Sequence, residues 1–393
     1  MPRLCPAVLL SLAACAPKAD SPAARDYLYL WTAAADSTKP DYLAVLDVTE
    51  DSARYGRLVT TVPVPGLANG PHHTEHQMPA DGRLFVNGFA SGKTFIFDMS
   101  NPVAPRLDGE FGDVEGMMHP HSYLRLPGGN VLVTFQMQHE AAGVAPGGLA
   151  EISPRAEVVR TSSANLPGVD RAIRPYSAGI VAALDRIVTT TTDMAADSAT
   201  HAVQIWRLSD LKLLHTINLP DGPAGNEGAA TAEPRVMEDE RTVLVSTFNC
   251  GLYLMEGLET ETPSARLVTS FPMKQGEYCA IPVIAGRYYL VTVPAFNAVV
   301  SLDISDPTAP REVSRVALGA GDVPHWISIA PDHRRVVLTG YGALEHRVLI
   351  LTFDQTTGRL GLDERFRPEG ATEPGWRVDG VPHGAVFSLT SDK

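Results

Sequence analysis

A motif that recurs seven times along the chain constrains its fold more than any other feature. Its clearest copies are the segments 97–106 and 302–311, which read FDMSNPVAPR and LDISDPTAPR. Weaker copies, in which a strand is followed by a polar turn and a second strand, start near residues 46, 152, 208, 254 and 353. Seven like units about 50 residues apart, each long enough for four short strands, are typical of a β-propeller. We therefore predict an all-β, seven-bladed β-propeller.

The composition agrees with many short strands joined by tight turns. The 393 residues include 33 glycines and 31 prolines, and no helical periodicity of useful length is present. A pair of β-sandwiches is the structural alternative, but it would not naturally give seven like units in series. The net charge of -13 argues against nucleic acid as a partner, because phosphate backbones are bound through an excess of Lys and Arg.

The two ends of the chain predict how the ring closes. The first unit contains strand-like segments at 27–32 and 41–48 but lacks an inner strand, whereas the last unit is followed by a polar loop, 367–380, and one more strand, 383–389. A closed ring leaves no exposed sheet edge at its seam. We expect the C-terminal strand to supply the inner strand of the first blade.

The N-terminal residues read as a targeting segment. Arg3 precedes a short apolar run, 4–14, that ends in LAAC at Cys15. This pattern is typical of a bacterial lipoprotein, with a signal peptide over 1–14, lipidation at Cys15, a polar tether over 15–25 and the propeller over 26–393. An ordinary secretory signal is the alternative. Spanning a membrane takes about 20 apolar residues, so we expect a periplasmic protein that is attached to the membrane only through its lipid.

Two cysteines remain once the N-terminal segment is set aside. Cys5 lies in the predicted signal peptide and Cys15 carries the predicted lipid, which leaves Cys250 and Cys279. Export places these two in an oxidising compartment, where they are either bridged or remain as two buried free thiols.

Histidines gather where the inner strands of the predicted blades begin. These strands line the channel of a propeller and all start at the same face. His383, the pair His72 and His73, and His121 lie next to the inner strands of three neighbouring blades, so we expect them to meet at one channel mouth. Neutral imidazoles suit a transition metal such as copper or zinc, whereas calcium and magnesium prefer oxygen ligands.

Three further histidines lie near the same strand starts. Alternation would place His119 on the same strand face as His121 unless Pro120 interrupts it, and we choose His121 as the ligand because it lies nearer the strand. His76, His119 and His325 are therefore candidates for contacts around the ligands. We assign His325 to the channel wall, because its blade lies on the far side of the blade that carries His383.

Two carboxylates are candidates for catalysis. Glu75 follows the histidine pair and Glu233 lies near the inner strand of another blade. Each would serve as a general base or as a partner of a histidine, with a solvated or salt-bridged carboxylate as the alternative. The sequence has no nucleophile elbow, P-loop or zinc-protease helix signature.

The motifs taken together resemble the selenium-binding protein and methanethiol oxidase family. The resemblance rests on His72 and His73, on the turn at 98–106, on MHPHS at 118–122, and on the segments 203–206, 216–222 and 302–307, all in the family's order. The family has a seven-bladed propeller fold, and its methanethiol oxidases are exported copper enzymes with histidine ligands. Those ligands fall on His72, His73, His121 and His383. The family's cysteine-rich segment has no counterpart in residues 74–82.

The resemblance implies an exported copper-dependent oxidase with a small thiol and O2 as substrates. Methanethiol would give formaldehyde, hydrogen sulfide and hydrogen peroxide. A non-catalytic propeller for metal binding, metal delivery or partner binding is the alternative. A calcium-dependent hydrolase of the lactonase type is a third reading, but it would need inward Asp, Glu or Asn at several blades, where this chain has mostly His.

Overall fold

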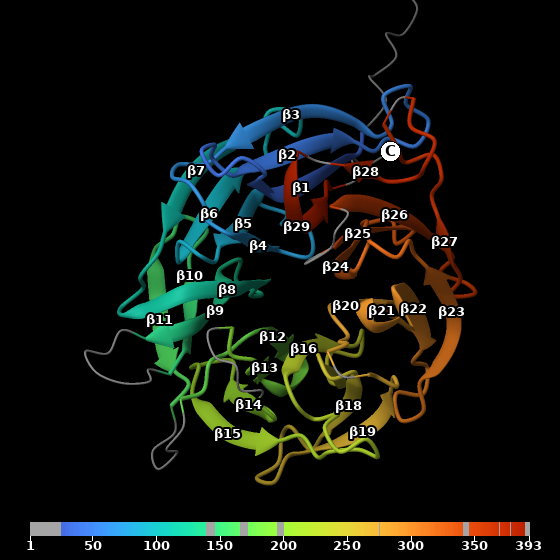
Figure 1. Ribbon diagram of the computed structural model, residues 1–393. Helices are drawn as coiled ribbons and strands as arrows, with labels where there is room; N and C mark the ends of the chain where they lie inside the picture. Colours follow the sequence, from blue (N-terminus) through green and yellow to red (C-terminus); the bar gives the residue numbers. More distant parts are fainter. Residues whose placement is uncertain are drawn as a thin grey trace, which may run out of the picture.

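Seven antiparallel sheets are arranged in a ring in the computed structural model (Figure 1). The structure describes residues 25–138, 146–165, 172–194, 200–274, 276–340, 346–368, 370–377 and 379–389. The predicted signal peptide, Cys15 and all of the predicted tether except its last residue lie outside these ranges. No helix among the described residues is long and apolar enough to cross a membrane. The prediction of an all-β, seven-bladed β-propeller is confirmed.

The blades follow one another in chain order, and the strands of each blade are named from the innermost to the outermost. Blade 1 contains β29 (Gly380–Phe387), β1 (Tyr27–Ala34), β2 (Tyr42–Asp47) and β3 (Arg57–Pro63). Blade 2 contains β4 (Pro71–Thr74), β5 (Arg83–Gly88), β6 (Lys93–Asp98) and β7 (Arg106–Phe111). Blade 3 contains β8 (Met117–Arg125), β9 (Val131–Gln138), β10 (Gly148–Ile152) and β11 (Val158–Ser163). Blade 4 contains β12 (Ala178–Val181), β13 (Arg186–Thr190), β14 (Ala202–Arg207) and β15 (Leu213–Asn218).

The remaining three blades repeat this layout. Blade 5 contains β16 (Thr231–Val236), β17 (Val243–Thr247), β18 (Gly251–Glu256) and β19 (Ser264–Ser270). Blade 6 contains β20 (Pro282–Ala285), β21 (Tyr288–Val293), β22 (Ala298–Asp303) and β23 (Arg311–Ala317). Blade 7 contains β24 (Pro324–Ile329), β25 (Arg335–Gly340), β26 (Arg347–Phe353) and β27 (Leu360–Leu362), with β28 (Trp376–Arg377) also paired to β26. Two short 3-10 helices, η1 (Ala182–Leu184) and η2 (Pro294–Phe296), complete the assignment.

The recurring sequence motif lies at the end of the third strand of a blade. β6 ends at Asp98 and β22 ends at Asp303, and each carboxylate accepts a hydrogen bond from the backbone N–H two residues later, at 2.9 Å in both cases. Aspartate is favoured at such a position because its side chain can bond its own backbone two residues on and so form a turn. The motif is therefore the turn between the third and fourth strands.

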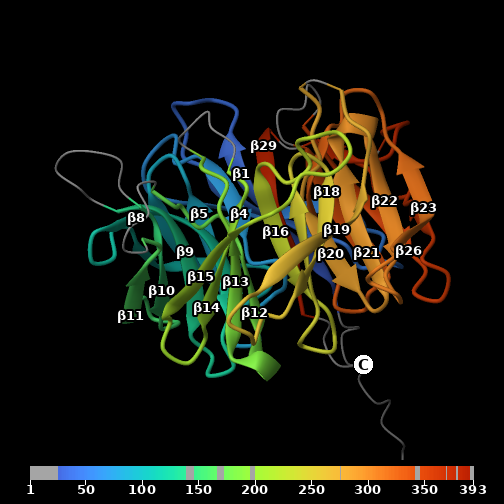
Figure 2. The ribbon, with the colours of Figure 1, turned by 90° about the horizontal axis from the view of Figure 1, so that it is seen from below.

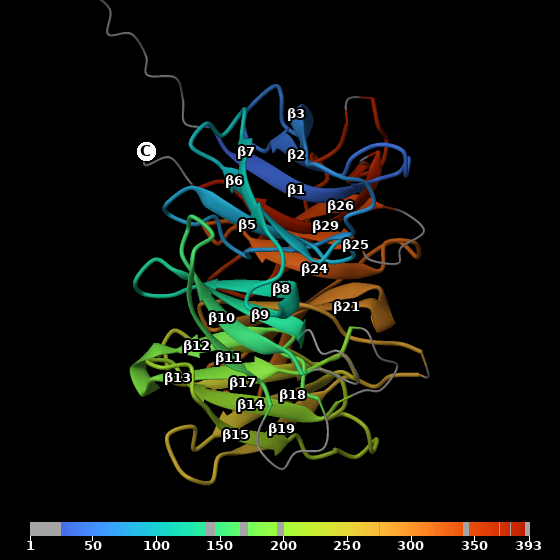
Figure 3. The ribbon, with the colours of Figure 1, turned by 90° about the vertical axis from the view of Figure 1, so that its left-hand side faces the viewer.

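The C-terminal strand closes the ring, as the two chain ends predicted. β29 pairs antiparallel with β1, and Leu30 lies opposite Ala385. All three views place β29 beside β1 (Figures 1, 2 and 3). Blade 7 is tied to this seam by Trp326, whose Nε1 donates to the carbonyl of Ala385 at 2.9 Å, and by Arg335, whose guanidinium bonds Asp26 at 2.8 Å.

The core lies between neighbouring blades and not at the channel. β5 is almost entirely buried, because both faces of its sheet pack against an adjacent blade, whereas the outer strand β7 alternates between exposed and half-buried residues. One apolar cluster joins blades 1 and 2, another joins blades 2 and 3, and further clusters continue around the ring. This packing leaves the inner strands free to carry polar side chains into the channel.

A disulfide links blade 5 to the approach to blade 6. Cys250, which precedes β18, is bonded to Cys279, which precedes β20, and both are buried. The bridge closes a loop with a sequence separation of 29. Constraining a loop of this size in the unfolded chain is worth about 3 to 4 kcal/mol.

The free energy of unfolding of the double variant Cys250→Ser/Cys279→Ser is expected to be about 2 to 4 kcal/mol lower than that of the wild type, because its unfolded chain is less constrained. Urea unfolding with and without a thiol reductant measures the difference. The double variant is its own control, since the reductant should not shift its midpoint. A wild-type midpoint that is unchanged by complete reduction would contradict the stabilising role.

Candidate metal centre

Five imidazoles project from the inner strands of four consecutive blades. In ring order, His325 lies on β24, His383 on β29, His72 and His73 on β4, and His121 on β8. The sequence pattern had placed these residues just before their strands, whereas the structure includes them in the strands. All five side chains are at least 95% buried, with exposed fractions of 0 to 5%.

The rings are in mutual contact. His72 stacks on His73 with centroids 4.3 Å apart and on His383 with centroids 4.1 Å apart. The ring centroids of His121 and His73 are 4.2 Å apart. One ring nitrogen from each of His72, His73 and His121 can be chosen so that all three lie within 4.8 Å of one another. The structure thus brings together the four histidines that the sequence named as ligands.

His325 is closer to this group than the sequence interpretation implied. Its ring centroid is 4.9 Å from that of His383, in an edge-on arrangement. The sequence correctly placed its blade next to that of His383 but gave no measure of the channel radius. We define the histidine cluster as His72, His73, His121, His325 and His383.

Asn87 on β5 aligns the strands that carry two of these histidines. Its side-chain oxygen accepts a hydrogen bond from the backbone N–H of His73 at 2.6 Å, and its amide nitrogen donates to the carbonyl oxygens of Pro120 and His121 at 3.0 and 3.3 Å. Asn87 is fully buried, and its own carbonyl accepts a bond from the indole of Trp31. One side chain therefore fixes β4 relative to β8, and sequence reasoning missed it.

The carbonyl oxygen of Tyr176 fixes the proton position on His121. This oxygen lies 2.7 Å from Nδ1 of His121. A carbonyl only accepts, so Nδ1 carries the proton and Nε2 carries the lone pair. Metal-binding histidines commonly donate their second nitrogen to a carbonyl in this way.

Ser122 fixes the proton position on His73. Its hydroxyl donates to the carbonyl of Tyr176 at 3.0 Å and lies 3.3 Å from Nδ1 of His73. Because the hydroxyl proton is used at Tyr176, its oxygen accepts from Nδ1–H of His73, which leaves Nε2 of His73 as the lone-pair atom. Both Nε2 atoms are buried and have no hydrogen-bond partner in the part of the chain that the structure describes. Ser122 belongs to the MHPHS motif at 118–122, but no sequence pattern indicated a role for the carbonyl of Tyr176.

Burial keeps the cluster neutral. It lowers the pKa of His121 to about 3 and that of His325 to about 4. Burial is also the main reason that the pKa values of His72, His73 and His383 lie well below 6.5, and the neighbouring imidazoles lower them further. A desolvated imidazole surrounded by others resists protonation. The lone pairs therefore stay available to a cation at neutral pH.

His119 and His76 lie outside the cluster. His119 has a left-handed backbone, with φ of 56°, and its Nδ1 lies 3.1 Å from the carbonyl of Phe89. This backbone turn breaks the alternation that would have placed it beside His121. His76 stacks on Trp326 at 4.2 Å and accepts a bond from Arg235 at 2.9 Å. Trp326 also contacts His73, at 4.9 Å, so His76 is separated from the cluster by one ring.

Glu75 and Glu233 occupy different surroundings. Glu75 forms a two-pronged ion pair with Arg125, at 2.7 and 3.1 Å, and accepts the N–H of Phe85. Glu233 is buried, and one of its oxygens accepts from Ser177 at 2.5 Å and from Arg235 at 2.6 Å. The other oxygen, Oε1, has no hydrogen-bond partner among the described residues. Glu75 is thus engaged in an ion pair, whereas Glu233 retains one open acceptor.

Two pockets flank the cluster at opposite ends of the inner strands. The apolar pocket, of about 430 Å³, adjoins the strand starts and is lined by His72, Tyr176, Met194, Phe248, Tyr278, Val323 and His325. The arginine pocket, of about 420 Å³, adjoins the strand ends and includes Glu75, His76, Arg125 and Arg235 in its lining. A cavity of about 30 Å³, large enough for one water, lies between His73 and Arg235.

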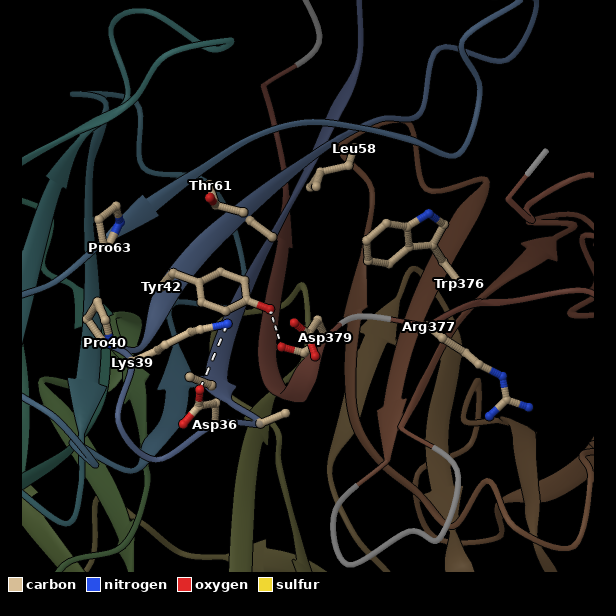
Figure 4. A pocket seen from close by; sticks show the side chains of 13 residues that line it. Asp36, Lys39, Pro40, Tyr42, Leu58, Thr61, Pro63, Trp376, Arg377 and Asp379 are labelled. Carbon is tan, nitrogen blue, oxygen red and sulfur yellow. Dashed lines mark hydrogen bonds and ion pairs between the residues drawn. The ribbon is translucent and has the colours of Figure 1, made fainter.

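Another pocket lies away from the histidines, near the seam of blades 1 and 7. It has a volume of about 500 Å³ and is lined by Tyr42 and Leu58 from blade 1 and by Trp376 from blade 7 (Figure 4). The hydroxyl of Tyr42 donates to the carbonyl of Asp379 at 2.8 Å, and Lys39 pairs with Asp36 at 3.9 Å. The lining contains no imidazole, so this pocket offers no nitrogen ligands for a metal.

Acid is expected to destabilise the metal-free protein below about pH 6.5. The unfolded imidazole titrates near 6.5, whereas His121 and His325 in the folded chain titrate near 3 and 4. Between these values the unfolded chain binds protons that the folded chain does not. Each such imidazole then removes about 1.4 kcal/mol of unfolding free energy per pH unit. Urea unfolding between about pH 7 and pH 5 measures the slope.

The variant His121→Asn should flatten this slope, because one of the depressed imidazoles is gone. His215→Asn removes a half-buried imidazole from the outer strand β15, far along the blade from the cluster. It is the matched control and should keep the wild-type slope. An equal slope in the wild type and His121→Asn would contradict the assignment of the acid sensitivity to the cluster.

Comparison with known proteins identifies similar chains. No family model matches. The chain is 27% identical over 221 residues to a methanethiol oxidase of Hyphomicrobium sp., covering 50% of this chain and 49% of that protein. It is 23% identical over 328 residues to a methanethiol oxidase of Danio rerio, covering 72% and 69%. The match to the Hyphomicrobium protein thus spans about half of its length.

Similarity of structure extends over nearly the whole chain. A protein of Sulfolobus tokodaii described as a hypothetical selenium-binding protein superposes with a TM-score of 0.75 at 17% identity, covering 95% of this chain and 96% of that one. At this identity the likeness shows a common fold. The sequence and structural similarities together confirm, at low identity, the predicted resemblance to the selenium-binding protein and methanethiol oxidase family.

Proposed function

We propose that the protein is an exported, copper-dependent oxidase of a small thiol, with the metal held by His72, His73, His121 and His383. The observation that carries this proposal is the pair of buried Nε2 atoms on His73 and His121, which have no hydrogen-bond partner among the described residues. A buried lone pair without a donor is costly. A cation between these atoms would remove that cost.

The donor set fits copper. Imidazole nitrogens suit copper and zinc, and disfavour calcium and magnesium. Zinc has no redox chemistry, whereas the similar proteins of Hyphomicrobium and Danio rerio are named as oxidases. Copper, when bound, would carry electrons from the thiol to O2. The proposed overall reaction converts methanethiol, O2 and water into formaldehyde, hydrogen sulfide and hydrogen peroxide.

The surrounding residues would orient the substrate and exclude water. His72 and His325 line the apolar pocket, so a thiol entering that pocket reaches the cluster directly. Tyr176 and Ser122 hold His121 and His73 in the tautomers that present Nε2. Aromatic rings surround the imidazoles, including Trp326, Phe89 and Tyr176. They keep the site poor in water, which strengthens every electrostatic interaction within it.

Glu233 is the group that we propose to accept a proton in the channel. Its Oε1 is an open acceptor, and its Oε2 is held by Ser177 and Arg235. Ser177 and Arg235 also line the water-sized cavity that touches His73. We therefore propose that a proton leaving the thiol passes by way of this cavity and its lining residues Ser177 and Arg235 to Glu233.

Metal analysis of the purified protein tests the site. The wild type is expected to contain about one copper per chain after reconstitution, and His72→Ala and His383→Ala are expected to lose most of it, since each removes a nitrogen ligand. His119→Asn is the matched control, because His119 lies on β8 outside the cluster and Asn tolerates its left-handed backbone. A copper content per chain that is unchanged in both Ala variants would contradict the proposed metal site.

Oxygen uptake with methanethiol, measured on the same samples, separates an oxidase from a metal-binding propeller. The copper-loaded wild type and His119→Asn should consume O2 and release one hydrogen peroxide per thiol, and the two Ala variants should not. Copper binding without any O2 uptake would favour the non-catalytic alternative.

We also propose that the protein is periplasmic and anchored through a lipid on Cys15. The disulfide between Cys250 and Cys279 supports export, because such bonds persist in oxidising compartments. The wild type expressed in a bacterium should sediment with membranes, and Cys15→Ser should appear in the soluble periplasmic fraction. Membrane association of Cys15→Ser equal to that of the wild type would overturn the anchor.

A further inference from the structure

The apolar pocket is much larger than methanethiol requires. Its volume is about 430 Å³, which lies in the range of about 300 to 1,000 Å³ that is typical of sites for larger organic ligands. A molecule with one carbon and one sulfur occupies only about twice the roughly 30 Å³ of a liquid water. Methanethiol alone would leave most of the pocket empty.

The lining selects for uncharged groups. Met194, Phe248, Tyr278 and Val323 come from loops of blades 4 to 7 and form the pocket together with Tyr176 and the two histidines. None of these lining residues is Asp, Glu, Lys or Arg. Placing a charged group here would cost several kcal/mol without a compensating partner. The pocket therefore disfavours thiols that carry an ammonium or a carboxylate, such as cysteine.

The rings in the lining favour a flat apolar group. The ring of Phe248 is nearly parallel to that of His325, with an angle of 8° and a centroid distance of 6.5 Å, and it stands edge-on to Tyr176 at 5.6 Å. Tyr278 lies 6.2 Å from His325 at 57°. Aromatic pairs gain energy at centroid distances of about 4.5 to 7 Å, and the flexible thioether of Met194 can adapt to an inserted ring.

We propose that the physiological thiol is an arylmethyl thiol, bound with its ring in the apolar pocket and its sulfur toward His72. This inference rests on the proposed function and specifies its substrate class. The carbon next to sulfur must carry hydrogen, since it becomes an aldehyde. Its bond to sulfur breaks, water supplies the aldehyde oxygen, and sulfur leaves as hydrogen sulfide. The two electrons and two protons released reduce O2 to hydrogen peroxide, so atoms and electrons balance.

A thiol series on the copper-loaded wild type tests the substrate class. We expect kcat/KM to rise from methanethiol through 1-butanethiol to phenylmethanethiol by about tenfold or more overall, because each added group fills more of the pocket. Cysteine should be at least about tenfold poorer than phenylmethanethiol. A kcat/KM for methanethiol or cysteine equal to or above that for phenylmethanethiol would overturn the inference.

Val323→Phe places a ring inside the pocket. Val323 has a positive φ of 39°, and replacing a β-branched residue with Phe adds no backbone strain there. The ratio of kcat/KM for phenylmethanethiol to that for methanethiol should fall by about tenfold. Val313→Phe makes the same change on the exposed outer strand β23 and should keep the wild-type ratio. Equal ratios in the two variants would contradict the inference that the apolar pocket binds the aryl group.

A binding measurement separates this inference from the proposed function. Benzyl methyl sulfide has no thiol proton and serves as the probe, with dimethyl sulfide as its small counterpart, in calorimetric titrations of the full chain. Preferential binding of the benzyl compound without oxidation of any thiol would support the pocket and refute the oxidase. Oxidation of methanethiol without binding of the benzyl compound would support the oxidase and refute the pocket.

Discussion

The placement of the channel residues depends on a hydrogen bond that links one blade to the next. A polar side chain on the second strand of a blade donates to the carbonyl oxygen of a channel residue on the following blade. The donors and acceptors are Asn87 to His121, Thr134 to Tyr176, Thr190 to Ala232, Thr292 to His325 and Thr339 to His383. Buried carbonyls need such partners, so these bonds fix where five of the seven inner strands sit against the preceding blade, including those that carry His121, His325 and His383.

The histidine cluster is stable only because burial opposes its protonation. Five imidazoles in contact could not all carry a proton, since like charges at about 4 to 5 Å in a desolvated channel repel strongly. The chain instead directs backbone and hydroxyl groups at one nitrogen of His121 and of His73. This leaves a buried lone pair without a hydrogen-bond partner among the described residues on Nε2 of each of these two imidazoles, which is costly. The burial that makes the cluster acid-sensitive also keeps these nitrogens unprotonated at neutral pH, as the proposed metal site requires.

The fold was predictable because its signals are local. The turn motif at Asp98 and Asp303, with its weaker copies, indicates the number of blades. The missing inner strand of the first unit predicts that the last strand of the chain closes the ring. Convergence of the histidines followed from that count. The sequence could not reveal that His119 adopts a positive φ and bonds the carbonyl of Phe89, or that the ring of His325 contacts that of His383. Both depend on backbone dihedrals and on the channel radius, which no local pattern encodes.

The channel separates two chemically different environments with the cluster between them. Apolar rings face the strand starts, and the ion pairs of Arg125 with Glu75 and of Arg235 with Glu233 face the strand ends. An uncharged organic substrate gains by approaching from the first side, whereas protons and small polar products are better solvated on the second. In the proposed reaction, this asymmetry would favour entry of the thiol from the apolar pocket and release of protons toward the arginine pocket. Glu233 is connected to the water-sized cavity beside His73 through Ser177 and Arg235, which line that cavity and donate hydrogen bonds to its Oε2.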